Sequence, residues 1–348
     1  MNKGLIALAF GGLAIGMTEF NMMGLLMDIA KDIDISIPKA SNLIGLYAVG
    51  VVVGAPTLVI ATANMAPKRV LFFLMLLFFI FNGVFALAPN ESSLYISRFI
   101  SGLPHGAFFG VGSVVAASLA KPGKEAQAIS VMFTGMTLAN LAGIPLGTYV
   151  GHHFSWRITY GVISCLGLVT AASIYFWLPD IKKLVINIRK QLNYFARKEA
   201  WLIIAVIAIG TGGLFAWISY IGPLVTKVSG VDEDKVPIIM FLVGLGMFIG
   251  NLIGGKLADT VIPTKAAMYS FLTMAVCLVL GYFVSYIEWA AYPMAFLTGA
   301  VAFSIGSSLQ MMLINSAEGA EILAASAGQG TFNIGNTLGL ILEQFQLD

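Results

Sequence analysis

Three ionisable side chains, Glu19, Arg98 and His105, lie inside long apolar stretches of the sequence. A charge at the centre of a bilayer costs about 3 kcal/mol or more unless it is paired, so such residues are candidates for chemistry. With a rise of about 1.5 Å per residue, Glu19 and Arg98 reach similar depths and are predicted to pair. A carboxylate near an arginine and near water can take up and release a proton as its surroundings change. His105, about two helical turns beyond Arg98, could extend that proton path.

The same three residues also fit a purely structural role. Glu19 and Arg98 could form a static ion pair buried among helices. His105 could be a packing residue held by a single hydrogen bond. The sequence leaves both alternatives open.

Uncharged polar side chains inside the apolar stretches form a second candidate site. Amides and aromatic rings suit sugars and other neutral polar ligands, although they equally suit hydrogen bonds between helices. Asn333 and Asn336 lie three residues apart and therefore share one helix face. The candidates for a substrate cavity are Asn140, Trp217, Tyr220, Gln310, Gln329, Asn333 and Asn336, with Asn251 as a further amide of the same kind.

The elements that hold these residues must be membrane helices. The chain has 348 residues, of which 58% are hydrophobic and 10% charged, and its mean hydropathy is +0.90. A water-soluble globule cannot bury that much apolar surface. A run of about twenty apolar residues spans the hydrocarbon core of a bilayer. Such runs predict an all-α polytopic membrane protein with spans at 4–27, 40–62, 69–88, 93–119, 125–150, 157–178, 201–226, 236–258, 264–286, 290–313 and 321–342.

Basic residues predict the orientation of these eleven spans. Most lysines and arginines fall in the loops on the side of the N-terminus, among them Lys68, Arg69, Lys121 and Lys124. Cytoplasmic loops retain such residues, so the N-terminus is predicted to be cytoplasmic. The first stretch is too long for a signal peptide and has no small-residue cleavage site, so it is predicted to remain as a span.

The sequence also contains a repeat with an offset of 196 residues, which places Gly50 on Gly246 and aligns further small and polar residues. Many secondary transporters consist of two similar halves. The same offset predicts a twelfth span near 353–374, beyond Asp348, so the second half is expected to hold about five helices. The predicted parts are a six-helix bundle over 1–178, a basic cytoplasmic linker over 179–200 and a second, shorter bundle over 201–348.

Three short motifs lie in this framework. The fourth span contains RFISGLPHGA at 98–107, and the fifth contains a glycine-rich stretch that ends with GIPLG at 143–147. The loop after span 236–258 begins with GKLAD at 255–259, whereas the equivalent loop at 61–69 has no aspartate. With these motifs the chain resembles the major facilitator superfamily, and within it the proton-coupled drug and sugar efflux permeases of the bacterial arabinose-efflux type.

The resemblance implies a role for each motif. Two six-helix bundles would rock about a central cavity, with Arg98 tied to proton coupling. The fifth-span motif of Gly135, Gly143, Pro145 and Gly147 would shape the bend between two access states. The loop motif of Gly255, Lys256 and Asp259 would close the cytoplasmic gate, with Asp259 at the N-terminus of a neighbouring helix or near a basic residue, a setting that favours carboxylates.

The expected function is secondary active transport in the bacterial inner membrane, in the form of proton-coupled efflux of a sugar or a small amphipathic compound, including drugs. A facilitative transporter without proton coupling and a truncated inactive form are the alternatives. The expected partners are a small-molecule substrate, protons and lipid, with no nucleic acid, and the expected state is a monomer.

No HExxH, GxSxG or P-loop motif occurs, so neither an enzyme nor an ATP-driven pump is expected. Cys165 and Cys277 lack metal-site spacing, so no cofactor or metal is expected.

Overall fold

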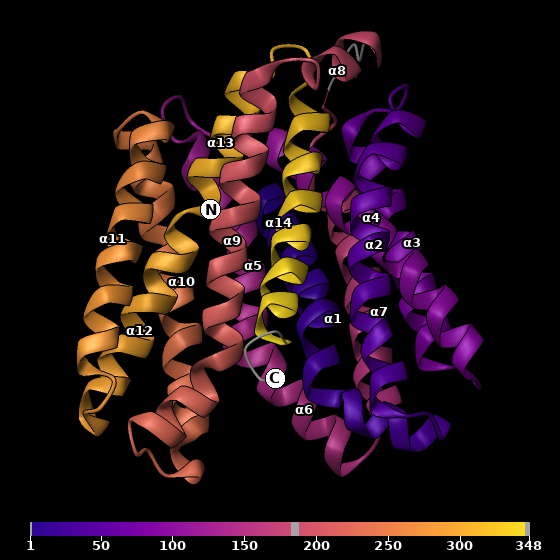
Figure 1. Cartoon of the computed structure of the whole chain (residues 1–348). Helices are drawn as coiled ribbons and strands as arrows, with labels where there is room; N and C mark the ends of the chain where they lie inside the picture. Colours follow the sequence, from indigo (N-terminus) through magenta and orange to yellow (C-terminus); the bar gives the residue numbers. More distant parts are fainter. Residues whose placement is uncertain (1, 182–187, 345–348) are drawn as a thin grey trace.

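The structure is a computed structural model that describes residues 2–181 and 188–344, except the side chains of 214–216, 218–220 and 337–344. Long helices run back and forth between two ends of the molecule (Figure 1). The first half contains α1 (Lys3–Ile33), α2 (Ile37–Ala61), α3 (Pro67–Ala86), α4 (Glu91–Ser118), α5 (Glu125–Leu138), the π-helix η1 (Ala139–Gly143), α6 (Ile144–His153) and α7 (Trp156–Trp177). The linker contains α8 (Ile188–Tyr194). The second half contains α9 (Lys198–Pro223), η2 (Leu224–Val228), η3 (Glu233–Lys235), α10 (Val236–Thr260), α11 (Pro263–Val284), α12 (Glu288–Ser304), α13 (Gly306–Ser316) and α14 (Glu321–Gln344).

The all-helical prediction is confirmed for the described residues, and nine segments among them are long and apolar enough to cross a membrane. These segments are Lys3–Ile33, Ile37–Ala61, Pro67–Ala86, Glu91–Ser118, Glu125–His153, Trp156–Trp177, Glu233–Thr260, Pro263–Val284 and Glu288–Ser316. The predicted spans 201–226 and 321–342 fall on α9 and α14, whose side chains are described only in part. The number of spans and the division at 179–200 therefore stay predictions. The helix α1 continues to Ile33, beyond the predicted end of the first span at residue 27.

The two ends of the molecule differ in the loops that they carry. One end, at the top of Figure 1, carries α8 and the loops 62–66, 119–124, 261–262 and 317–320. We call this the linker end. The opposite end, which we call the far end, carries the turns between α1 and α2, between α6 and α7, and between α11 and α12.

Local signals in the sequence fix where the helices begin. The side chain of Asn2 accepts a hydrogen bond from the N–H of Gly4 at 2.9 Å and so caps α1. Asn90 and Ser93 bond each other's backbone N–H groups at the start of α4. Such caps satisfy N–H groups that have no partner within the helix. They set the helix starts from which the depths of Glu19 and Arg98 follow.

Close glycine contacts join matching helix pairs in the two halves. A Cβ atom on Gly50 of α2 would lie 2.2 Å from the carbonyl oxygen of Phe99 in α4. In the second half, a Cβ atom on Gly246 of α10 would lie 2.1 Å from the carbonyl oxygen of Phe296 in α12. Only glycine allows helix backbones to approach this closely. The repeat in the sequence thus corresponds to a repeated helix contact.

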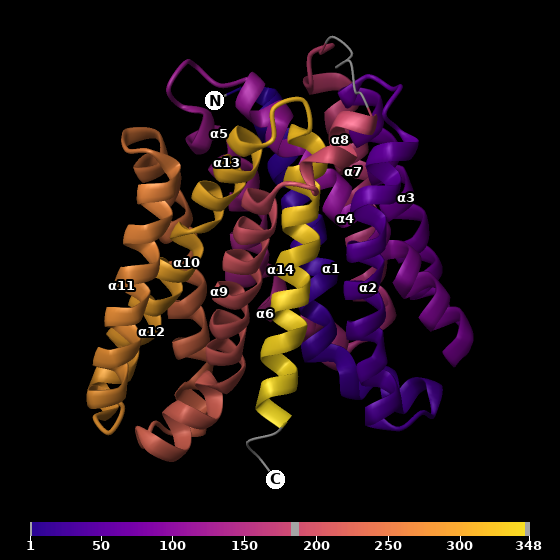
Figure 2. The same cartoon turned by 45° about the horizontal axis from the view of Figure 1, so that its top comes forward.

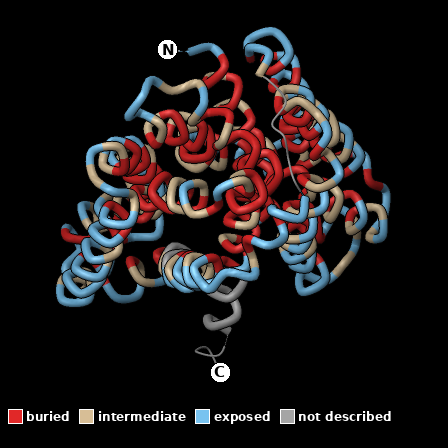
Figure 3. The backbone as a smooth tube through the Cα atoms, turned by 90° about the horizontal axis from the view of Figure 1, so that it is seen from above, coloured by how far each residue is buried: buried red, intermediate tan, exposed pale blue. Residues whose placement is uncertain are grey.

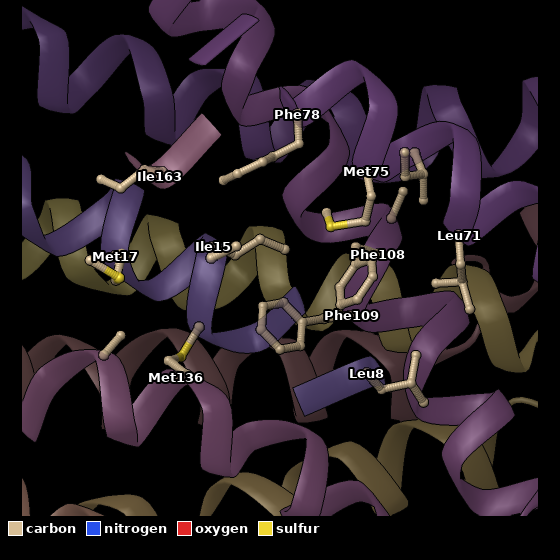
Figure 4. Packing of buried hydrophobic residues seen from close by; sticks show 14 of the residues in the cluster. Leu8, Ile15, Met17, Leu71, Met75, Phe78, Phe108, Phe109, Met136 and Ile163 are labelled. Atoms are coloured by element: carbon tan, nitrogen blue, oxygen red, sulfur yellow. The ribbon is translucent and has the colours of Figure 1, made fainter. Parts of the chain in front are cut away.

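Burial follows the pattern expected of a protein surrounded by lipid. Viewed along the helices, buried residues gather in the centre and exposed residues form the rim (Figure 3). Phe108 and Phe109 of α4 lie at the centre of the packing shown in Figure 4, near Ile15 and Met75. Many large apolar side chains on the rim are exposed, as on the face of α11 that includes Leu272. Such a surface requires an apolar solvent.

Candidate functional site

A buried polar cluster in the first half surrounds Arg98, which is 1% exposed. Its guanidinium group donates hydrogen bonds to the carbonyl oxygen of Thr18 at 2.9 Å, to the Thr18 hydroxyl at 3.1 Å and to the carbonyl oxygen of Leu43 at 3.4 Å. Its Cζ atom also lies 4.2 Å from the ring centre of Tyr47. Carbonyl dipoles and an aromatic face together offset the cost of burying the cation.

Thr18 links this arginine to two further helices. Its hydroxyl donates to the amide oxygen of Asn82 in α3 at 2.5 Å. The hydroxyl of Tyr160 in α7 donates to the Thr18 carbonyl oxygen at 3.4 Å. Together with Leu43 and Tyr47 of α2, the cluster therefore joins α1, α2, α3, α4 and α7 around one cation.

Glu19 lies next to this cluster but does not pair with Arg98. The side chain is buried, and neither carboxylate oxygen has a hydrogen-bond partner among the described residues. None of the ion pairs between described residues joins it to Arg98. The predicted direct pair is wrong, because the guanidinium group is held by Thr18, and residues 18 and 19 point about 100° apart on a helix.

His105 joins the cluster through an aromatic residue that the sequence did not indicate. Its Nδ1 atom lies 3.2 Å from the hydroxyl of Tyr47, whose ring also covers Arg98. Its Nε2 atom has no hydrogen-bond partner in the described part of the chain. The contacts thus run from Arg98 through Tyr47 to His105, while a proton path along them stays a prediction.

A cavity of about 80 Å³ lies among α5, α9, α10 and the helices of the second half that follow. It has room for several water molecules. Its polar lining comes from Thr211, Asn251, Gln310 and Gln329, and its aromatic lining from Phe133, Phe271, Phe303 and Phe332. Among the described residues, none that lines this cavity is ionisable. The structure thus brings together two of the predicted candidates, Gln310 and Gln329, and the further amide Asn251.

Other predicted cavity residues lie elsewhere. Asn140 donates to the carbonyl oxygen of Met136 in its own chain segment at 3.1 Å, and Asn333 likewise donates to Gln329. Trp217 lines a different hollow of about 230 Å³ among α9, α11 and α12. Asn140, Asn333 and Trp217 are not among the residues that line the cavity of about 80 Å³. Asn336 is buried, and its amide oxygen has no partner among the described residues. The side chain of Tyr220 lies outside the described residues.

Asp259 connects the two halves at the linker end. One carboxylate oxygen accepts the N–H of Ala126 at 2.8 Å, and the other accepts the N–H of Gln127 at 3.0 Å. Both N–H groups belong to the first turn of α5, where the helix dipole favours a negative charge. The prediction that Asp259 would meet a helix N-terminus is confirmed. Gly255 lets the helices approach, because a Cβ atom there would lie 2.5 Å from Ser130, whereas Lys256 is exposed.

The glycines of the fifth-span motif face α1, within the same half. A Cβ atom on Gly135 would lie 1.8 Å from the carbonyl oxygen of Ala9, and one on Gly147 would lie 2.2 Å from the side chain of Asn21. Gly143 meets Met17 in the same way. The helix changes to the π form at Ala139–Gly143, just before Pro145. Proline removes one N–H donor from the helix, which explains the widened turn.

Comparison with known proteins identifies the family to which this arrangement belongs. The sequence profile of the Major Facilitator Superfamily matches residues 8–342. The chain belongs to this superfamily. Members of the superfamily are membrane transporters, so the chain is a multi-pass transport protein and not an enzyme.

Relatives and solved structures agree with this assignment. The protein AraJ of Escherichia coli (strain K12) is 40% identical over 97% of this chain and 86% of its own length. The inner membrane transport protein YdhP of the same strain is 37% identical over 97% of this chain and 87% of its own length. A Helicobacter pylori protein named as a probable sugar efflux transporter is 29% identical over 91% of this chain and 81% of its own length. The superfamily transporter FucP in the outward conformation has the same fold, with a TM-score of 0.77, 15% identity and coverage of 99% of this chain and 92% of its own.

Several residues of the two polar sites were missed by sequence reasoning. Thr18, Tyr47 and Asn82 complete the Arg98 cluster, while Ser113 and Ser130 bond amides of the cavity across the two halves. Serine and threonine are common in membrane helices, where they bond their own backbone. A helical-wheel comparison with Arg98 could have indicated Asn82. It could not have indicated which carbonyl or hydroxyl oxygen accepts the hydrogen bonds of the arginine.

Proposed function

We propose that this chain is a secondary active transporter that couples efflux of a small neutral polar compound, such as a sugar, to proton entry. The observation that carries the proposal is the uncharged cavity of amides and aromatic rings, with hydrogen bonds between the two halves on its linker side. The two halves would rock as bundles about this cavity and expose it to one side of the membrane at a time. The N-terminus and the linker end would face the cytoplasm.

Glu19 is the proposed proton carrier. A buried carboxylate without hydrogen bonds is costly in its ionised form, so it needs either a proton or a nearby cation. The nearby cation, Arg98, donates hydrogen bonds to Thr18, the residue next to Glu19, and to Leu43, but none to Glu19 itself. A change in helix packing that brings the guanidinium group or water closer to Glu19 would favour loss of the proton. Closing the site again would favour its uptake.

Glu19→Gln is expected to abolish substrate-driven proton movement in proteoliposomes, because the amide cannot ionise. The measurement is the pH change inside the vesicles after addition of L-arabinose, D-xylose, lactose or an amphipathic cation. Glu318→Gln, at an exposed carboxylate of the linker end, is the matched control and is expected to behave as the native protein. Unchanged proton movement in folded Glu19→Gln would show that the coupling group lies elsewhere, and transport without proton movement would favour a facilitative transporter.

The uncharged cavity favours a neutral substrate over a cation. We expect a saccharide of the panel to bind the native protein and tetraphenylphosphonium not to bind, as measured by calorimetry in detergent. Gln329→Leu is expected to weaken saccharide binding about ten-fold, because one buried hydrogen-bonding group is lost. Asn140→Leu, which changes an amide that bonds its own helix, is the control. Tighter binding of the cation than of every saccharide would contradict this substrate class.

A further inference from the structure

Asn251 lines the cavity and at the same time bonds the other half of the chain. Its amide nitrogen donates to the carbonyl oxygen of Ser130 in α5 at 2.8 Å and to the hydroxyl of Thr134 at 3.1 Å. The hydroxyl of Ser130 donates in return to the carbonyl oxygen of Asn251 at 2.8 Å. Asn251 is 1% exposed. Both amide protons are therefore engaged, and both with the first half.

Gln310, on α13, also lines the cavity and also bonds the first half of the chain. Its amide nitrogen donates to the hydroxyl of Ser113 in α4 at 3.0 Å and to the carbonyl oxygen of Ala325 in α14 at 3.3 Å. Its amide oxygen accepts from Gln329 at 3.4 Å. The two protons of this amide are also engaged, one of them across the halves.

These bonds lie on the linker side of the molecule, where the halves are packed closely. A Cβ atom on Gly110 of α4 would clash with Ser326 of α14, and one on Gly255 of α10 would clash with Ser130 of α5. Separation of the halves at this end would leave the amides and hydroxyls without their present partners. Buried polar groups without partners are costly, so the bonds hold this end closed until other partners replace them.

We propose that Asn251 and Gln310 are coupling residues, through which a hydroxyl-bearing neutral substrate in the cavity releases the linker end. This inference rests on the proposed function. Hydroxyl oxygens of the substrate would accept the amide protons that Ser130, Thr134 and Ser113 accept in this structure. Each bond gained by the substrate therefore costs one bond between the halves. The substrate stabilises the state in which the linker end is open, as differential binding requires.

Ser113 and Thr134 make this proposal testable, because they bond the coupling residues without lining the cavity. Both native cysteines are first replaced, as Cys165→Ser and Cys277→Ser. Spin labels are then attached to Lys124→Cys in the first half and Thr260→Cys in the second. Pulsed electron spin resonance between the two labels measures the distance across the linker end. Without ligand, Ser113→Ala and Thr134→Val are each expected to raise the population with the long distance about three- to ten-fold. Thr331→Val, at a buried hydroxyl that bonds the Ala327 carbonyl oxygen of its own helix and does not line the cavity, is expected to leave it unchanged.

Binding of L-arabinose, D-xylose and lactose to the same variants separates coupling from simple packing. Ser113→Ala is expected to bind the preferred saccharide several-fold more tightly than the native protein, because the competing acceptor is gone. A purely structural serine would give equal or weaker binding, and that result would overturn the coupling role, as would unchanged ligand-free distances in both variants. If no saccharide binds the native protein or changes the distance between the labels, the substrate class of the proposed function is wrong. The proposed competition between substrate and Ser113 is then overturned as well. The label distances without ligand still decide whether the bonds between the halves hold the linker end closed.

Discussion

Arg98→Ala is expected to destabilise the folded protein by about 3–5 kcal/mol, the typical cost of breaking a buried charge arrangement by removing one partner. The substitution removes the three hydrogen bonds to Thr18 and Leu43 and leaves the buried carboxyl group of Glu19 without a neighbouring cation. Transport is expected to be lost as well. The free energy of unfolding in mixed detergent micelles, followed by circular dichroism, measures the effect.

A second substitution tests the reason for this loss. Adding Glu19→Gln to Arg98→Ala is expected to restore part of the stability, because the buried group can then no longer carry a charge. Arg69→Ala, at an exposed arginine of the linker end, is the control and should change stability by about 0.5 kcal/mol or less. If Arg98→Ala is as stable as the control, the cluster does not depend on its cation.

Asp259→Ala is expected to open the linker end and to lower the transport rate by a factor of about ten or more. Asp259 supplies two charge-assisted hydrogen bonds to the first turn of α5, at 2.8 and 3.0 Å. Bonds to a charged group contribute about 1.5–3 kcal/mol each, and these two are present only while the halves are in contact. Their loss shifts the equilibrium away from the closed linker end. The distance between labels at positions 124 and 260 and the rate of uptake into vesicles measure the two effects.

Two variants define how this contact works. Asp259→Asn keeps one acceptor oxygen without the charge and is expected to fall between Ala and the native protein. Thr264→Ala, at an exposed residue in the first turn of α11 at the same end, is the control and leaves both labelled positions free. A native distance distribution in Asp259→Ala would contradict a gating role for this residue.

The helices could be predicted from the sequence because each depends on local information. Apolar stretches of spanning length, capping residues such as Asn2 and Asn90, and prolines in first turns specify where a helix begins. The length of α1 beyond residue 27 has a tertiary reason. Asp32 lies in the last turns of this helix and pairs with Arg157 of α7 at 2.9 Å.

The motif around Asp259 was predictable for a similar reason. Asp259 lies in the last turn of α10, and every helix N-terminus offers free N–H groups to a carboxylate. That Arg98 bonds Thr18 and not Glu19 was not predictable in the same way. Equal depth on two helices does not determine rotation, and the rotation of α1 presents Thr18 to the arginine.

The sequence by itself determined the class of protein, the helices, the repeated glycine contacts and the types of residue available for chemistry, because composition and periodicity act over short distances along the chain. The tertiary structure alone decided which polar groups meet. It joined Asn251 and Gln310 to hydroxyl groups far away in the sequence and turned Asn140 toward its own helix. These outcomes depend on how each helix is rotated and packed, since a shift of one residue turns a side chain by about 100° and exchanges one partner for another.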